Sequence, residues 1–208
     1  MRVPVAAEGW PFVFLPAAAA CILAVTGFRV AAGVCGAASL ACLGFFRDPE
    51  RRVPGVPGAV VAPADGKVMD VAPVDDPWVG PATRVSIFLS PLDVHVNRAP
   101  VGGLVASVDY AAGSFKAAYK AAASEVNERC TVALEGESAR VVVRQIAGVL
   151  ARRIVCRVRP GDKLTRGERF GLIRFGSRTD LVVPRGTDIR VRVGDRVRGG
   201  ESMMGVLR

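Results

Sequence analysis

Two apolar runs without any charged residue occupy most of the first 46 residues. They extend from Pro11 to Gly27 and from Val30 to Phe46, and Arg29 lies between them. Each run of 17 residues would be about 25 Å long as a helix, slightly less than the ~30 Å hydrocarbon core of a bilayer. A charge at the centre of a lipid-exposed helix is costly, so we expect Arg29 at a turn. The sequence therefore predicts a membrane-associated helical hairpin over residues 1–46.

Basic residues follow this hairpin directly, at Arg47, Arg51 and Arg52. Because cytoplasmic ends of membrane helices are enriched in Lys and Arg, we expect these arginines to anchor the hairpin at the cytoplasmic face of the cell membrane. A secretory signal peptide is the alternative, since Arg2 precedes the first apolar run. The length and doubling of the apolar region argue against it. Whether the hairpin spans the bilayer or re-enters it stays open.

Residues 47–208 have the pattern of a β domain. One helix is predicted around Ala117–Asn127, where Ala and Lys dominate. The chain is therefore predicted to be mainly β, with a β-sandwich-like domain after the hairpin. Short apolar or alternating runs bounded by turn residues predict the strands: Val60–Ala62, Lys67–Val71, Arg84–Leu89, Gly103–Tyr110, Cys130–Leu134, Arg140–Ile146 and Arg153–Val158.

The C-terminal third contains an internal repeat. Residues 160–173 (PGDKLTRGERFGLI) resemble residues 193–207 (VGDRVRGGESMMGVL), and Gly161 and Gly194 are matched. Each copy reads as a turn, a short strand, a Gly-containing turn and a second strand, and two copies are too few for a solenoid. The repeat predicts two pseudo-symmetric β-hairpins. Lipoyl-type carrier domains have a similar pattern, but here Lys163 lies off the hairpin tip and the second copy has no lysine.

The net charge limits the kinds of binding partner that we expect, and the cysteines bear on disulfides and metal sites. The chain has 28 Lys and Arg against 19 Asp and Glu, a net charge of +9, which favours an anionic membrane surface or a nucleic acid. The basic residues are scattered, and two Tyr and two Trp offer little stacking surface for bases, so we expect no nucleic acid. Five cysteines without a CxxC pair favour neither a disulfide framework nor a metal site.

Three short stretches contain side chains suited to chemistry. His95 is the only imidazole available for acid–base work near neutral pH, although a lone histidine is often structural. Asp65, in APADGKV, is either a turn residue or a carboxylate that orients a histidine. Ser177 follows Gly176 in FGSR, and glycine permits the distorted backbone that exposes its carbonyl to a serine hydroxyl. Each signal is weak alone.

With their flanking sequences, these stretches resemble the short form of the phosphatidylserine decarboxylase family. The long form has a second histidine where this chain has Arg98, so the resemblance leaves open whether His95 serves both cleavage and decarboxylation. The matching stretches run in family order from Phe45 to Arg178: FFRDPERRVP, APADGKV, FLSPLDVHVNRAP, GSF, NER, QIAGVLARRI and GERFGLIRFGSR.

The resemblance implies a proenzyme that cleaves itself between Gly176 and Ser177, giving a β chain of residues 1–176 and an α chain of residues 177–208. His95, oriented by Asp65, would take the Ser177 proton. Ser177 would become a pyruvoyl group that forms a Schiff base with the substrate amine, without a metal. The implied reaction converts phosphatidylserine to phosphatidylethanolamine and CO₂ in phospholipid biosynthesis. Arg98 is a candidate for substrate binding, and the family suggests a homodimer.

Two other functions are left open by the sequence. A related phosphoserine lipid, such as an ether lipid of the archaetidylserine type, would need the same chemistry. A non-enzymatic, membrane-tethered β-sandwich adaptor would have the hairpin and the repeat, and it would tolerate the loss of the Ser177 hydroxyl.

Overall fold

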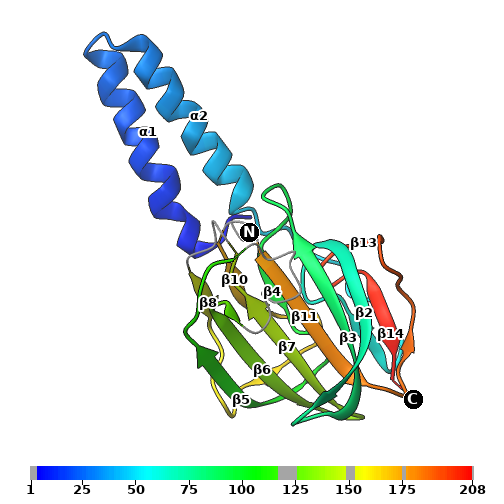
Figure 1. Ribbon diagram of the computed structural model, residues 1–208. Helices are drawn as coiled ribbons and strands as arrows, with labels where there is room; N and C mark the ends of the chain where they lie inside the picture. Colours follow the sequence, from blue (N-terminus) through cyan, green and yellow to red (C-terminus); the bar gives the residue numbers. More distant parts are fainter. Residues whose placement is uncertain (1–3, 117–125, 149–152, 175–176, 208) are drawn as a thin grey trace. The chain divides into compact units, whose positions relative to one another are not determined.

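The computed structural model describes residues 4–116, 126–148, 153–174 and 177–207 (Figure 1). The chain divides into two compact units, Met1–Glu50 and Arg51–Arg208, and each is described by itself. The helix predicted around Ala117–Asn127 falls almost entirely on residues outside the described ranges.

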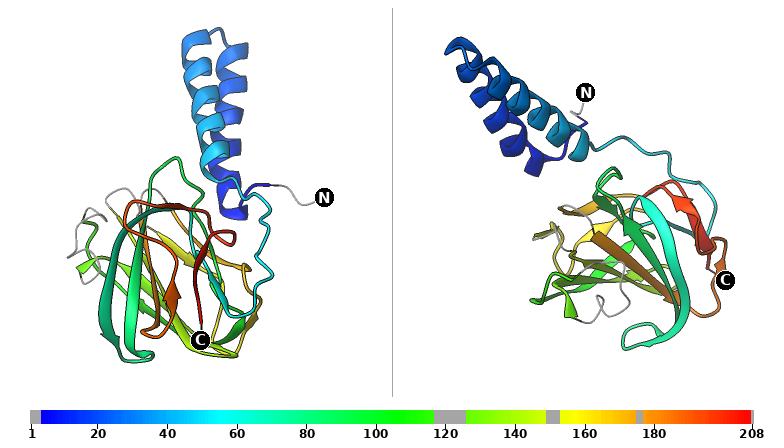
Figure 2. Two further views of the ribbon diagram at one scale, coloured as in Figure 1. Left: turned by 90° about the vertical axis from the view of Figure 1, so that its right-hand side faces the viewer. Right: turned by 45° about the horizontal axis from the view of Figure 1, so that its top comes forward.

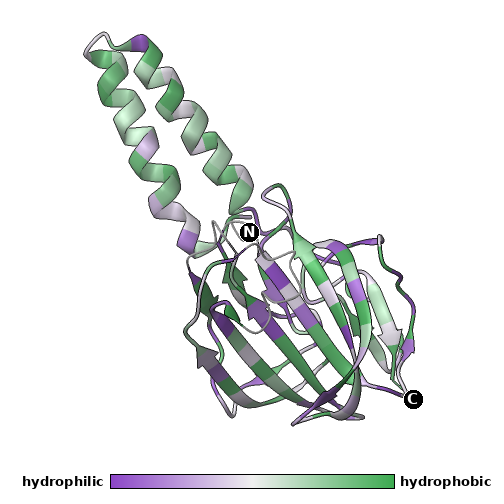
Figure 3. Cartoon of the chain, viewed as in Figure 1, coloured by the Kyte–Doolittle hydropathy of each residue, from purple (hydrophilic) through white to green (hydrophobic). Residues whose placement is uncertain are grey.

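The first unit is a hairpin of two apolar helices, coloured green along most of their length in Figure 3. A short 3-10 turn, η1 (Ala7–Gly9), leads into α1 (Trp10–Val25), and α2 (Arg29–Phe45) returns beside it. The Ser39 hydroxyl joins the helices by donating to the Val13 carbonyl at 2.8 Å. The segment Ala7–Val25 is long and apolar enough to cross a membrane, whereas Arg29–Phe45 is shorter. Both helices lie where the apolar runs predict them, and Arg29 begins the second.

Large aliphatic side chains of the hairpin are exposed, among them Leu15, Ile22 and Val30. Exposed apolar surface of this extent is unusual for a soluble protein and is typical of a surface that another apolar phase covers. The hairpin therefore has the surface that a membrane-associated segment needs.

The second unit consists of strands folded into three antiparallel sheets. An eight-stranded, curled sheet has the order β13-β2-β3-β11-β7-β6-β5-β9, and two three-stranded sheets have the orders β1-β14-β12 and β4-β10-β8. The strands are β1 (Ala59–Val61), β2 (Gly66–Asp76), β3 (Gly80–Leu89), β4 (Val96–Arg98), β5 (Gly103–Ala111), β6 (Arg129–Gly136), β7 (Arg140–Ile146), β8 (Ile154–Cys156), β9 (Lys163–Leu164), β10 (Arg169–Ile173), β11 (Ser177–Pro184), β12 (Asp188–Ile189), β13 (Arg196–Val197) and β14 (Met203–Val206).

One apolar core joins the three sheets, and both views in Figure 2 show the strands of this unit wrapped around a common interior. Val60 of β1, Phe170 of β10 and Leu181 of β11 are all buried in it. Burial of a side chain of this size contributes roughly 1.5–3 kcal/mol. The prediction of a mainly β, sandwich-like domain is confirmed.

The repeat has a different structure from the predicted hairpins. In each copy the first strand joins one end of the eight-stranded sheet, β9 beside β5 and β13 beside β2, while the second strand is the centre of a three-stranded sheet. Gly161 and Gly194 have matching φ angles of 96° and 102°, which favour glycine at both turns. The two strands of each copy thus bridge two sheets instead of pairing with each other. The hairpin prediction was wrong because sequence alone does not show which strand each one pairs with.

Strand β11 was not predicted, yet it lies at the centre of the large sheet between β3 and β7. Leu181 and Val183 face the main core, and Val182 faces a second apolar cluster on the other side of the sheet. Because both faces of β11 are covered, its polar residues are buried too.

Candidate active site

Ser177 is the first residue of β11 and lies opposite Leu89 of β3. Its side chain is fully buried, and its Oγ has no hydrogen-bond partner among the described residues. Such an unsatisfied hydroxyl costs about 1–3 kcal/mol. Alternation along the strand places the Ser177 side chain on the same face as Thr179 and Leu181, toward the interior. Gly176, the other residue of the predicted cleavage site, lies outside the described residues.

His95 follows the end of β3 and precedes β4, and it is fully buried. Its Nδ1 lies 2.9 Å from the main-chain carbonyl of Asp93. A carbonyl only accepts hydrogen bonds, so Nδ1 carries the proton and the lone pair of the neutral ring is on Nε2. This is the tautomer that a general base needs.

Two contacts bring the His95 segment to the strand that begins at Ser177. The Ile173 amide, four residues before Ser177, donates to the His95 carbonyl at 3.2 Å. Asn97, two residues after His95, donates through Nδ2 to Thr179 Oγ1 at 3.1 Å. These contacts place the segment that carries His95 beside the strand that Ser177 begins.

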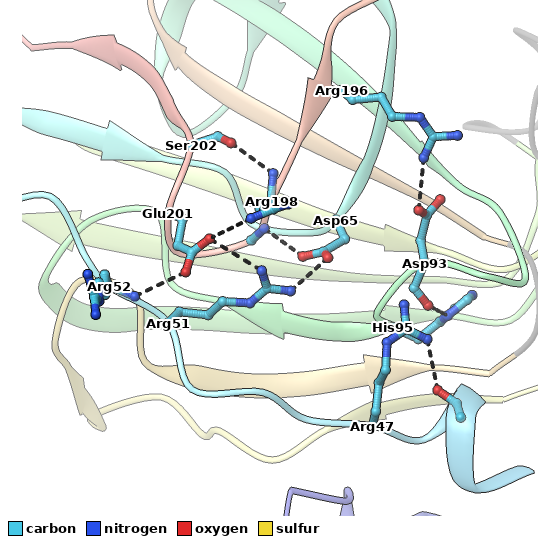
Figure 4. Close-up of polar contacts among 12 residues, drawn as sticks. Arg47, Arg51, Arg52, Asp65, Asp93, His95, Arg196, Arg198, Glu201 and Ser202 are labelled. Atoms are coloured by element: carbon cyan, nitrogen blue, oxygen red, sulfur yellow. Dashed lines mark hydrogen bonds and ion pairs between the residues drawn. The ribbon is translucent and has the colours of Figure 1, made fainter.

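A turn of four residues holds the His95 segment. Asp93 Oδ2 accepts hydrogen bonds from both the main-chain amide and the hydroxyl of Ser90, each at 2.8 Å. Asp93 Oδ1 accepts a third bond from Arg196 at 3.1 Å, as Figure 4 shows. The carboxylate of Asp93 thus fixes the turn whose carbonyl binds the imidazole.

Asp65 is held by a different set of partners (Figure 4). Its Oδ2 accepts from Arg51 Nη2 at 2.7 Å, and its Oδ1 accepts from the Gly199 amide at 2.7 Å. Burial raises the pKa of this carboxyl, while the Gly199 amide and the Arg51 guanidinium act in the opposite direction. The carboxylate that the sequence assigns to His95 is therefore bound by an arginine and a backbone amide, whereas His95 Nδ1 bonds to Asp93.

Arg51 was expected to anchor the hairpin at a membrane, together with Arg47 and Arg52. Its side chain is only 8% exposed and makes ion pairs with Asp65 and Glu201. This expectation was wrong for Arg51, because the carboxylates of Asp65 and Glu201 bind its buried guanidinium.

Arg98, the residue proposed to bind substrate, is buried, and its Nη1 donates to the Gly167 carbonyl at 3.1 Å. Its amide donates to the Pro63 carbonyl at 2.9 Å. These contacts give Arg98 a structural role in the precursor, and its role toward substrate stays a prediction.

The sequence analysis missed a buried polar layer beside Ser177. Thr179, Gln145 and Asn97 are fully buried and joined by hydrogen bonds across β11, β7 and β4. The available signal was polar residues within otherwise apolar, strand-forming segments.

Within the described ranges, no three His, Cys, Asp or Glu side chains gather as a metal site would require. A groove of about 490 Å³ is lined by other residues, including Asp76, Trp78, Tyr110 and Arg144. The buried Ser177 and His95 stay the candidate catalytic residues.

Comparison with known proteins identifies the family of this chain. Residues 39–205 match the phosphatidylserine decarboxylase family. The phosphatidylserine decarboxylase proenzyme of Symbiobacterium thermophilum is 48% identical, covering 100% of this chain and 98% of the relative. Those of Nocardia farcinica and Desulfotalea psychrophila are 49% and 42% identical, each covering 98% of this chain and 88% and 97% of the relative. The chain belongs to the phosphatidylserine decarboxylase family.

Proposed function

We propose that this chain is a self-processing enzyme that converts phosphatidylserine to phosphatidylethanolamine and CO₂. The single observation that carries the proposal is the buried Ser177 hydroxyl without a described partner, on the side of β11 that faces the His95 segment. Buried hydroxyls without a partner are uncommon in natural proteins, and a catalytic role is one of the reasons for them. Membership of the family supplies the reaction type.

The cleavage step uses groups of this chain alone. His95 Nε2 accepts the Ser177 proton as Oγ attacks the carbonyl carbon of Gly176. The C–N bond breaks, an ester C–O bond forms, and the proton passes to the released amine. Loss of the Ser177 Cα proton then expels the Gly176 carboxylate and leaves a carbon–carbon double bond at residue 177. Tautomerisation and attack by water release ammonia and leave a ketone, the pyruvoyl group.

The residues around Ser177 fit this group. Cleavage removes the hydroxyl that has no described partner, so the conversion relieves the unsatisfied atom. When present, the pyruvoyl ketone supplies an electron-withdrawing carbonyl for the electron pair that departing CO₂ leaves behind. His95, on the facing segment, would deliver the proton to the substrate Cα. Asp65, bound to Arg51, would act on this site by setting the local charge.

The two chains made by cleavage would stay together. β11 belongs to the α chain, and its neighbours β3 and β7 belong to the β chain, with antiparallel pairing on both sides. The apolar hairpin and the net charge of +9 support a location at an anionic membrane, on its cytoplasmic face. The homodimer suggested by the family stays a prediction.

The first test is the intact mass of the purified chain beside Ser177→Ala. We expect two fragments, residues 1–176 and 177–208, with the smaller lighter by one ammonia than a serine-headed fragment. Ser177→Ala should remain full-length with an unchanged far-UV circular dichroism spectrum. A full-length wild-type chain would contradict self-processing. CO₂ release from vesicles of carboxyl-labelled phosphatidylserine or of its ether-linked analogue would then identify the lipid.

A further inference from the structure

The amide of Asn97 is the centre of the buried polar layer. Asn97 lies in β4 and is fully buried. Its Nδ2 donates to Thr179 Oγ1 at 3.1 Å and to the Pro63 carbonyl at 3.4 Å, and its Oδ1 accepts from Gln145 Nε2 at 2.9 Å. The amide thus uses both N–H groups and its oxygen, and three contacts from different directions fix its position.

Two of these contacts reach a segment that carries a residue of the proposed chemistry, and Asn97 itself lies in a third such segment. Asn97 itself is two residues after His95, and Thr179 is two residues after Ser177. Pro63 is two residues before Asp65. Two residues of extended chain span about 7 Å. The Asn97 amide therefore ties the three segments together, in each case two residues away from the side chain of the proposed chemistry.

The layer also joins strands that backbone pairing leaves in separate sheets. β4 is an edge strand of the sheet β4-β10-β8, whereas β11 and β7 lie in the eight-stranded sheet. Val143 and Leu181, paired across β7 and β11, belong to the apolar core next to the layer. A buried amide in such surroundings is favourable only when its hydrogen bonds are made. The spacing between the His95 segment and the Ser177 strand therefore depends on this side chain.

We propose that Asn97 is a positioning residue for self-cleavage, whose amide holds the His95 segment against the strand that begins at Ser177. The inference rests on the cleavage proposed above. Asn97 takes no part in bond making or bond breaking in this scheme, and it acts through His95 and Thr179.

The test measures the rate at which freshly synthesised, membrane-inserted precursor is cleaved. Asn97→Ala and Thr179→Val, which keeps the side-chain shape, should each slow cleavage by about tenfold or more, because each leaves a buried group unpaired. Thr179→Ser retains the hydroxyl and should restore a near wild-type rate. The double variant Asn97→Ala/Thr179→Val should be little slower than the slower single variant, since both lose the same bond.

Hydroxylamine, which cleaves esters, separates the two chemical steps. If Asn97 positions the imidazole for the first attack, little ester forms, and hydroxylamine should not accelerate fragment release from Asn97→Ala.

A mutation that only loosens the fold gives a different pattern. Val141→Ala, in the apolar core of β7, should lower the melting temperature and leave the cleavage rate of the folded chain unchanged.

The outcomes are distinct. In one outcome the wild-type chain cleaves, and the folded Asn97→Ala and Thr179→Val chains cleave at the same rate. That result overturns the positioning role and leaves the proposed function intact. Equal slowing by Val141→Ala and Asn97→Ala at matched stability also overturns it. A wild-type chain that never cleaves removes both proposals together. Slow cleavage in Asn97→Ala and Thr179→Val, restored in Thr179→Ser, supports the role.

Discussion

Arg51 Nη2 lies 2.7 Å from Asp65 Oδ2, and both side chains are largely buried. Burial raises the pKa of the Asp65 carboxyl above its usual 3.8, and the Gly199 amide and Arg51 offset this only in part. The folded chain therefore holds this proton more tightly than the unfolded chain does.

The raised pKa of Asp65 predicts that the fold loses stability as the pH rises. Between its ordinary value of 3.8 and its folded value, the folded state binds more protons, so the Asp65 contribution to stability falls as pH rises through this window. In a Ser177→Ala background, Asp65→Asn should remove this fall. Denaturant unfolding in detergent at a series of pH values measures it, and parallel curves for the two chains would contradict the prediction.

Removing the Arg51 guanidinium should make this fall in stability larger. Arg51→Gln deletes the charge that favours ionised Asp65, so the pKa of the carboxyl rises further and the fall in stability extends to higher pH. At neutral pH we expect a loss of about 3 kcal/mol, because a buried pair loses one member. Arg198→Gln is the matched control, since Arg198 is 73% exposed and its ion pair should contribute little. Similar losses for both variants would argue against the prediction.

Arg178 and Asp180 form a buried ion pair directly after Ser177, with Nε and Oδ1 2.6 Å apart. The Arg178 guanidinium also donates to Ser86 Oγ at 2.7 Å. In a Ser177→Ala background, Asp180→Asn should lower the free energy of unfolding by about 3–5 kcal/mol, because it leaves a buried cation uncompensated.

The double variant Arg178→Met/Asp180→Leu tests the reason for that loss. It removes both charges and should recover most of the stability, as measured by denaturant unfolding. A double variant as unstable as Asp180→Asn would show that lost packing, and not the uncompensated charge, is responsible.

The Asp93 turn should matter more for its internal bonds than for its surface ion pair. Asp93→Ala removes the acceptor of the two Ser90 hydrogen bonds and should slow cleavage, because the carbonyl that binds His95 is no longer fixed. Arg196→Ala breaks only a pair whose arginine is 72% exposed, so the cleavage rate should stay near wild type. Timed mass measurements on the precursor compare them, and an equal slowing in both variants would contradict the prediction.

The sequence predicted much of this fold because local patterns decide much of it. The apolar, β-branched run in Arg140–Ile146 gave β7 with its observed limits, and two uncharged runs gave the helices. β11 was missed because its pattern is irregular. Ser177 and Thr179 face inward, while Arg178 and Asp180 lie on the covered outer face and neutralise each other. Alternation between apolar and polar residues does not describe a strand that is buried on both faces.

The catalytic roles assigned to Ser177, His95 and Asp65 stay predictions, and the contacts of these residues were not predicted. Ser177 and His95 carry a recognisable chemistry, so motifs identified them. The partner of Asp65 is Arg51, in the linker that the sequence suggested was a membrane anchor. The Asn97 amide reaches Thr179, 82 residues away. Contacts over such separations depend on strand order, which the sequence pattern does not specify.

Cys130 of β6 and Cys156 of β8 form a thiol pair in the core, and it should be visible chemically. A hydrogen bond from Cys130 lowers the pKa of the Cys156 thiol to about 7, although burial opposes it. Iodoacetamide at pH 7.5, a value chosen just above that pKa, should therefore alkylate Cys156 of the folded chain readily, because the thiolate is the nucleophile. Cys130→Ala removes the donor, so the pKa should return toward 9.0 and alkylation should slow. The Cys156 thiol loses its proton at a lower pH in the folded chain than in the unfolded chain. The free energy of unfolding should therefore also rise with pH from about 7 to 9. Peptide masses separate Cys156 from Cys21, Cys35 and Cys42 of the hairpin, and equal Cys156 rates with and without Cys130 would show that this bond does not control its acidity.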